Sequence, residues 1–100
     1  MASERSIHNV RVSTASKMVS MPWESAQDFA GRALAAYPTV NPVVEQFRAR
    51  GVSRPVELLD ANDVTFALAV CEAWAARVGE DELPPGIVEL RDALREDAQK

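Results

Sequence analysis

The stretch DANDVTFALAVCEAWAARVG, residues 60 to 79, predicts the helix around which the rest of the chain is built. Asp60 and Asn62 are both suited to cap its N-terminus, because a short polar side chain can accept a hydrogen bond from a free backbone N–H group. Gly79 is suited to end it, since glycine readily adopts the left-handed conformation that often follows a helix. The pattern therefore indicates one long helix with both ends marked in the sequence.

The body of this predicted helix is apolar on nearly every side. Between residues 64 and 78 the only polar side chains are Thr65, Glu72 and Arg77. A helix of this kind is normally surrounded, because water would otherwise contact a large apolar surface. We therefore expect residues 63–78 to lie at the centre of the molecule, wrapped by neighbouring helices of the same chain. The alternative is that a second protomer or a partner covers part of the helix.

A second helix is predicted from Pro22 to about Ala36. Its apolar residues fall within a sector of about 100° on a helical wheel. They are Trp23, Ala26, Ala30, Ala33, Leu34 and Tyr37. Asp28 and Arg32 lie on the opposite side, and their spacing of four residues favours an ion pair. Both tryptophans of the chain lie on predicted apolar faces, so we expect them in the core.

The segment from residue 41 to 59 predicts a helix, a turn and a short helix. Asn41 and Pro42 suit the start of the first helix, and Gly51 suits its end. The following SRPVELL, residues 53 to 59, predicts a short helix or helical turn. Together they have the local pattern of a helix-turn-helix, a motif that reads DNA through its second helix.

The match to a DNA-reading motif is only partial. The second helix would be about six residues long, which barely reaches across a groove. It would present Glu57 and Asp60 beside Arg54, and carboxylates cannot neutralise phosphate. The net charge of the chain is −4, whereas DNA binding normally needs a basic excess. We therefore favour helix packing as the role of this segment and keep a DNA-binding, helix-turn-helix-like regulator as the alternative function.

The two ends of the chain complete the predicted fold. Residues 9–14 alternate apolar and polar side chains as a half-buried strand does, and residues 17–21 can pair with them through a turn. Pairing with a second protomer and a flexible N-terminal arm are the alternatives. The last helix, residues 86–100, follows an acidic, proline-containing connector. Its apolar side carries Ile87, Leu90, Leu94 and Ala98.

Residues that carry catalysis or bind metals are scarce. His8 is the only histidine and Cys71 the only cysteine, so neither the usual ligand set of zinc nor a well-ordered histidine-assisted nucleophile can be assembled. Cys71 is expected in the core with a raised thiol pKa. The four glycines are scattered singly, which excludes a glycine-rich phosphate loop. We therefore predict no enzyme, no cofactor and no metal.

Composition indicates a compact protein of one domain. The chain has 100 residues, of which 47% are hydrophobic and 26% charged, enough for a single core. One cysteine excludes an internal disulfide, and we expect neither a secretory leader nor a membrane-spanning segment, so a reducing cytoplasm fits best. Arginine outnumbers lysine nine to two, a bias associated with GC-rich bacterial genomes.

These patterns predict a mainly α protein. We expect a small bundle of four main helices and a short helical turn around the central helix of residues 63–78, with an N-terminal β-strand or hairpin. In this division residues 1–21 form the strand, hairpin or flexible arm, and residues 22–100 form a single helical domain.

The predicted function is binding rather than catalysis. Residues 1–50 carry six basic and four acidic side chains, whereas residues 51–100 carry five and eleven, and such opposite-signed halves suit association with another protein or with a second copy. We predict a small cytoplasmic adaptor or regulator that acts through a helical surface, and we prefer a homodimer. The charge argues against nucleic acid, and no membrane contact is expected. A ligand pocket beside Trp74 is left open. The predicted contact residues are Arg48, Arg50, Arg54, Glu80, Asp81 and Glu82.

Overall fold

Two short strands open the described part of the chain and form a hairpin. The computed structural model describes residues 9–36, 42–49 and 54–99. Strand β1 (Asn9–Thr14) pairs antiparallel with β2 (Met18–Pro22). At the turn, the backbone N–H of Thr14 donates to the carbonyl of Lys17 at 2.9 Å, and the Lys17 N–H donates to Thr14 Oγ1 at 3.0 Å. The predicted hairpin is therefore confirmed, and its turn is closed by a threonine side chain instead of glycine.

One carboxylate from the far end of the chain also holds this turn. Asp97 Oδ2 accepts a hydrogen bond from the backbone N–H of Ala15 at 3.1 Å, and its Oδ1 accepts one from the Ser16 hydroxyl. The last turn of the final helix is thus bound to the first turn of the sheet.

The third strand is a departure from the predicted fold. Residues 53–59 are predicted as a short helix or helical turn, but Val56–Leu58 form strand β3, which pairs parallel with β1 and gives the order β2-β1-β3. Val56 and Leu58 are buried and Glu57 between them is exposed. That alternation is the pattern of a half-buried strand, and its pairing partner lies more than 40 residues away, where a local pattern cannot show it.

The sheet has one covered face. Side chains that point to this face are buried: Val10, Val12, Thr14, Val19, Met21, Val56 and Leu58. The intervening side chains of all three strands are exposed or half-buried. Because strand residues alternate between the two faces, the helices cover one face and leave the other open to solvent.

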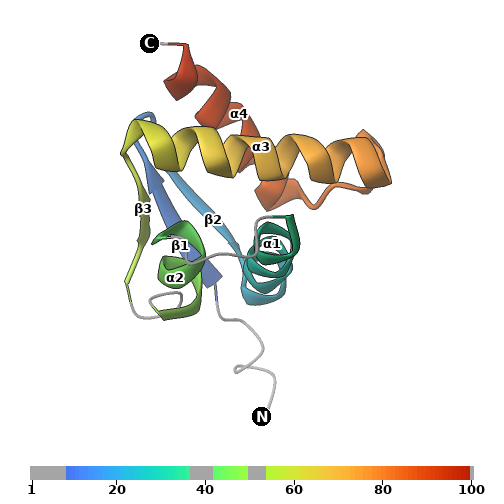
Figure 1. Cartoon of the computed structure of the whole chain (residues 1–100), viewed down its shortest axis with the longest axis horizontal. Coiled ribbons are helices and arrows are strands. Elements are labelled where there is room, and N and C mark those ends of the chain that lie inside the picture. The colour runs from blue at the N-terminus through green and yellow to red at the C-terminus, as the bar shows by residue number, and fades with distance from the viewer. Residues whose placement is uncertain (1–8, 37–41, 50–53, 100) are drawn as a thin grey trace.

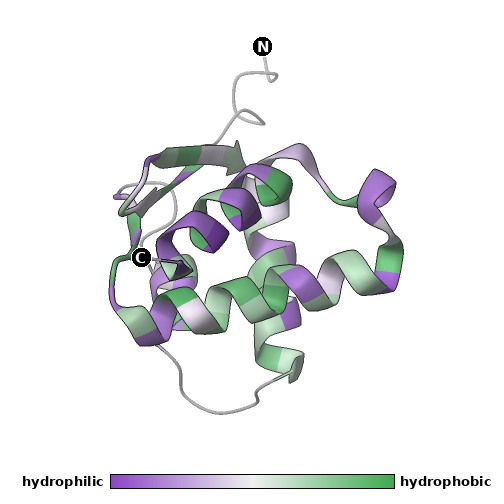
Figure 2. Cartoon of the chain, turned by 90° about the horizontal axis from the view of Figure 1, so that it is seen from above, coloured by the Kyte–Doolittle hydropathy of each residue, from purple (hydrophilic) through white to green (hydrophobic). Residues whose placement is uncertain are grey.

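Four α-helices and one short 3-10 helix make up the rest of the described chain. They are α1 (Trp23–Ala36), α2 (Pro42–Ala49), α3 (Ala61–Val78), η2 (Glu80–Glu82) and α4 (Pro85–Ala98). Helices α1 and α2 lie side by side below α3, and α4 crosses behind it (Figure 1). Seen from above, α3 lies farther from the sheet than α4 (Figure 2). The chain is thus mostly helical, with a small sheet built mainly from its N-terminus.

The ends of α3 agree with the sequence. The Asp60 side chain accepts a hydrogen bond from the Asn62 N–H at 3.0 Å, as an N-cap does. Gly79 has a φ of +92°, a conformation that side chains with a Cβ rarely adopt, and its N–H donates to the Ala75 carbonyl at 2.8 Å. Both predicted boundaries are confirmed.

The coverage of α3 is less complete than its composition predicts. The buried arc consists of Val64, Ala67, Val70, Cys71, Trp74 and Ala75. Thr65, Ala73 and Ala76, by contrast, are exposed. The prediction of a helix wrapped on most sides therefore holds only for one arc. Arg77 is exposed as well, so the exposed residues between positions 64 and 78 are two polar side chains and two alanines, whose methyl groups leave little apolar area in water.

Two predicted core stripes are shifted around their helices. Trp23 is 45% exposed and Leu34 is also exposed, so the prediction that both lie in the core is wrong. The centre of the buried arc of α1 is Phe29, whose ring centroid lies 4.8 Å from that of Phe47 on α2. Contact with α2 therefore sets which side of α1 is inside. On α4, the predicted core residue Ala98 is exposed.

Candidate functional site

An open groove lies between the C-terminal half of α1 and the middle of α3. Its volume is about 420 Å³, within the range of ligand pockets in proteins. Its lining consists of Arg32, Ala35, Ala36, Val70, Ala73, Trp74 and Arg77. We call it the α1–α3 groove. The sequence leaves a pocket beside Trp74 open, and the structure places one there.

Small side chains create this groove. Helix α1 ends with Ala35 and Ala36, and α3 presents Ala73 toward the same space. Methyl groups cannot fill the room between two helices that cross at this point, so a hollow remains. Trp74, only 4% exposed, gives the hollow a rigid aromatic wall. The result is a concave, largely apolar surface on a rigid scaffold.

Arg32 is held over this wall by an aromatic ring. Its guanidinium carbon lies 4.3 Å from the centroid of the Trp74 ring, a cation–π distance. Asp28 Oδ1 lies 4.0 Å from Arg32 Nε, so the predicted ion pair exists only at its outer limit. Among the described residues no group accepts a hydrogen bond from this buried Nε. Arg32 therefore retains hydrogen-bonding capacity beside the groove.

A second cation lies on the other helix of the groove. Arg77 is exposed, lines the groove from α3, and lies one helical turn after Ala73. With Arg32 on α1, the apolar floor has a guanidinium from each of its two helices. Guanidinium groups match carboxylates in geometry and charge, so this surface is complementary to a ligand that is both apolar and acidic.

The predicted basic contact residues lie elsewhere. Arg48 on α2 and Arg54 just before β3 are both exposed, and Arg50 falls outside the described residues. The Gln46 side chain joins their two segments: its Nε2 donates to the Glu57 carbonyl at 2.9 Å, and its Oε1 accepts from the Glu57 N–H at 2.8 Å. The basic residues thus belong to one end of the molecule, where α3 begins.

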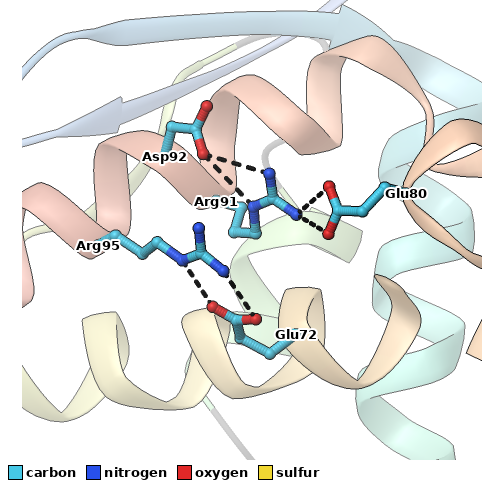
Figure 3. Close-up of polar contacts among 5 residues, drawn as sticks. All are labelled: Glu72, Glu80, Arg91, Asp92 and Arg95. Atoms are coloured by element: carbon cyan, nitrogen blue, oxygen red, sulfur yellow. Dashed lines mark hydrogen bonds and ion pairs between the residues drawn. The ribbon is translucent and has the colours of Figure 1, made fainter. Parts of the chain in front are cut away.

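The predicted acidic contact residues form η2, at the opposite end of α3. Glu80 is engaged inside the protein: Arg91 Nη1 donates to both of its carboxylate oxygens, at 2.8 and 2.6 Å (Figure 3). Asp81 and Glu82 are exposed. The structure therefore does not bring the basic and acidic groups together, and it gives Glu80 a structural role.

Arg91 is the buried cation that the sequence pattern missed. It is 6% exposed and contacts Asp92 Oδ1 at 3.4 Å as well as Glu80. The hydrogen bond with Glu80 raises the pKa of Arg91, more than burial lowers it. A neighbouring pair joins α4 to α3, since Arg95 donates to both oxygens of Glu72 at 2.7 and 3.1 Å (Figure 3). The two pairs join α4 to η2 and to α3.

The helix-turn-helix is not formed by the described residues. Its second helix is replaced by β3, and Glu57, one of the residues it would present to a groove, lies in the sheet. A three-residue strand cannot enter the major groove as a recognition helix does. The described residues of this segment therefore provide no recognition helix.

Other chemistry finds little support in the described part of the chain. Cys71 is fully buried, and burial raises the pKa of its thiol to about 12, as predicted for a core cysteine. No group of three or more potential metal ligands occurs among the described residues, and His8 lies outside them. No helix in the described ranges has the length and apolar character needed to cross a bilayer.

Comparisons with protein-family models, with curated proteins and with solved structures gave no match to this chain. The α1–α3 groove and the charges around it are the features that bear on function.

Proposed function

We propose that this protein is a non-enzymatic interaction module, an adaptor or regulator, that binds an acidic amphipathic helix of a partner protein in the α1–α3 groove. The observation that carries the proposal is the pair Arg32 and Arg77 on the two helices that flank an apolar hollow. A helix with a few apolar side chains in line and carboxylates beside them complements this surface in both respects.

The residues that line the groove determine how such a helix would bind. Its apolar side chains would enter the hollow between Ala35, Ala36 and Ala73, and its carboxylates would meet the two guanidinium groups. Arg32 is already held by the Trp74 ring, so little side-chain entropy is lost when a carboxylate binds it. Pairing at the rim of an apolar contact sets orientation and partner choice more than total affinity.

The experiment is a selection from a library of displayed helical peptides with a fixed leucine stripe and random charges beside it. We expect the selected peptides to be rich in Asp and Glu next to the stripe. Ala73→Glu should weaken their binding at least tenfold, because it fills the groove and adds a negative charge. Ala76→Glu is the matched control, since Ala76 is exposed on the same helix but does not line the groove. Selection of basic peptides, or equal effects of the two variants, would overturn the proposal.

A double variant tests the charges without filling the hollow. Arg32→Gln with Arg77→Gln should weaken binding of the selected peptides and remove most of its salt dependence. Arg48→Gln with Arg54→Gln is the matched control, because both residues lie outside the groove. If the groove alone binds the peptide, this variant should leave binding unchanged; weaker binding would show that these two residues also contact the partner, as the sequence predicts. Far-ultraviolet circular dichroism of each variant checks that the fold is intact.

A further inference from the structure

The two edges of the sheet differ in whether their outward backbone groups are hydrogen-bonded. At the β3 edge, the amide of Gln46 pairs with both the N–H and the carbonyl of Glu57. A primary amide used in this way occupies the positions that a neighbouring strand would take. Exposed edges otherwise invite pairing with another chain, so Gln46 blocks this edge at its central residue.

The other edge belongs to β2, and the hairpin register shows which of its groups face outward. Thr14 and Lys17 are hydrogen-bonded to each other, and in an antiparallel pair bonded and non-bonded positions alternate. The backbone N–H and carbonyl of Val19 and Met21 therefore point toward β1. The backbone N–H and carbonyl of Met18 and Ser20 point away from it. Among the described residues no hydrogen bond to these outward groups of Met18 and Ser20 is seen.

Large apolar side chains lie at both ends of this open edge. Met18, at its first residue, is 50% exposed, and Trp23, directly after its last residue, is 45% exposed. Isolated exposed apolar residues are common on protein surfaces. Here two of them bracket the edge with unpaired backbone groups, while the blocked edge has Glu57 at its centre.

We propose that β2 pairs antiparallel with β2 of a second copy of this chain, across a twofold axis at Ser20, so that the two sheets join into one of six strands. Ser20 would donate its N–H to the partner's Ser20 carbonyl and accept the reciprocal bond. The N–H of Met18 would donate to the carbonyl of the partner's Pro22.

The proposed β2–β2 register agrees with the short length of the edge and with the apolar residues at its ends. Proline has no N–H, so the ladder stops at Pro22. A twofold axis at Ser20 places Met18 of one strand opposite the exposed Pro22 of the other, next to the Trp23 that follows it, so the apolar residues at the two ends of the edge come together. An interface of this kind is self-complementary, as a twofold dimer requires.

This inference does not depend on the α1–α3 groove. Helix α1 begins beside β2 and runs away from the sheet (Figure 2), and the groove lies near its C-terminal end. A dimer through β2 would leave both grooves free, so the two copies would present two binding sites to a bivalent partner. Loss of dimerisation would abolish only the avidity, whereas loss of peptide binding would remove the proposed function and leave the dimer intact.

The test is sedimentation equilibrium of the whole chain over a wide range of concentrations. We expect a monomer–dimer equilibrium that Met18→Lys weakens at least tenfold, because it places a charge against the partner's apolar group. Leu59→Lys is the matched control: Leu59 is also exposed, at 56%, but lies outside β2, and its change should leave the dimer unaltered. Ser20→Pro should give a monomer and Ser20→Ala a dimer, because only proline removes the outward N–H.

Amide hydrogen exchange gives a second readout that needs no substitution. The N–H groups of Met18 and Ser20 should exchange more slowly as the protein concentration rises, while that of Glu57 should not change. A wild-type chain that stays monomeric at millimolar concentration would overturn the proposal. So would a dimer that both Met18→Lys and Ser20→Pro leave unchanged, since the copies would then meet elsewhere.

Discussion

Arg91 Nη1 donates to both carboxylate oxygens of Glu80, and these two residues join the turn after α3 to the buried side of α4. The arginine side chain is 8% exposed and the glutamate side chain 63% exposed. The guanidinium is thus mostly removed from water and depends on its partner, whereas the carboxylate would remain hydrated without it. The pair matters chiefly because it satisfies the buried arginine.

Glu80→Gln should therefore destabilise the protein, although Glu80 itself is exposed. We expect a loss of about 1 kcal/mol in the free energy of unfolding, below the usual contribution of a hydrogen bond to a charged group, because solvent screens the exposed side of the pair. Glu82→Gln, in the same short helix, is the control and should change little. Urea denaturation measures both, and equal effects would contradict the role assigned to Glu80.

Gly86→Ala and Gly31→Ala should have opposite effects. A Cβ at Gly86 would lie 2.6 Å from the Met21 Cβ, so α4 would have to move off the sheet. We expect a cost of about 1–3 kcal/mol, as for other overpacked sites. At Gly31, in the middle of α1, a Cβ would meet nothing within 4 Å, and alanine should stabilise the helix by about 0.5–1 kcal/mol. Thermal unfolding of the two variants compares them, and a destabilising Gly31→Ala would show that the helix surface is wrongly assigned.

Cys71 should be unreactive in the folded protein. A pKa of about 12 leaves roughly one thiol in 10⁴ as the reactive thiolate at pH 8, and the side chain is fully buried. A thiol-specific disulfide reagent at pH 8 should therefore react slowly with the native chain and completely in denaturant. Rapid reaction without denaturant would show that α3 opens or is not packed as described.

The free energy of unfolding should depend on pH through the ionisation of Glu72. The hydrogen bond from Arg95 lowers the pKa of Glu72 below its ordinary value. A carboxyl group with a lowered pKa in the folded state contributes stability above its unfolded pKa, about 4.3, and loses it as the pH falls through the folded value. The urea midpoint of the wild type should fall more steeply below about pH 4.5 than that of Glu72→Gln. Parallel curves for the two proteins would contradict this contribution.

Duplex DNA should not bind through Arg48 on α2. The recognition helix that this binding would need is replaced by β3, and the net charge of −4 opposes contact with phosphate. A gel-shift experiment in low salt should show no retained complex for the wild type. Retention that Arg48→Ala abolishes would instead restore the DNA-binding alternative.

Local signals in the sequence located the helices well, because their causes are local. Asp60 and Gly79 mark the ends of α3 through hydrogen bonds to residues within four positions. The hairpin followed from simple alternation. Strand β3 could not be found in this way, since it is held by β1 and by the side chain of Gln46, and Pro55 with Leu58 fits a helical turn equally well.

The candidate site also depends on contacts between distant residues, which local sequence patterns cannot show. Arg32 lies on the polar side of α1 in the helical wheel, and nothing in its neighbourhood indicates that it covers Trp74, 42 positions later. The groove exists only because two helices cross where both carry alanines. Exposure of Trp23 is a comparable case: the wheel places it on the apolar side, but it is the first residue after β2 and lies at the rim of the sheet.

The carboxylate of Asp97 has a consequence for how the chain acquires its structure. It binds the turn that contains Ala15, 82 positions earlier, and α4 covers β2 and β1. During synthesis the hairpin emerges before α4, so these contacts form only after α4 has left the ribosome. Contacts between such distant positions slow folding, so the hairpin should gain its full protection from solvent only when α4 packs against it.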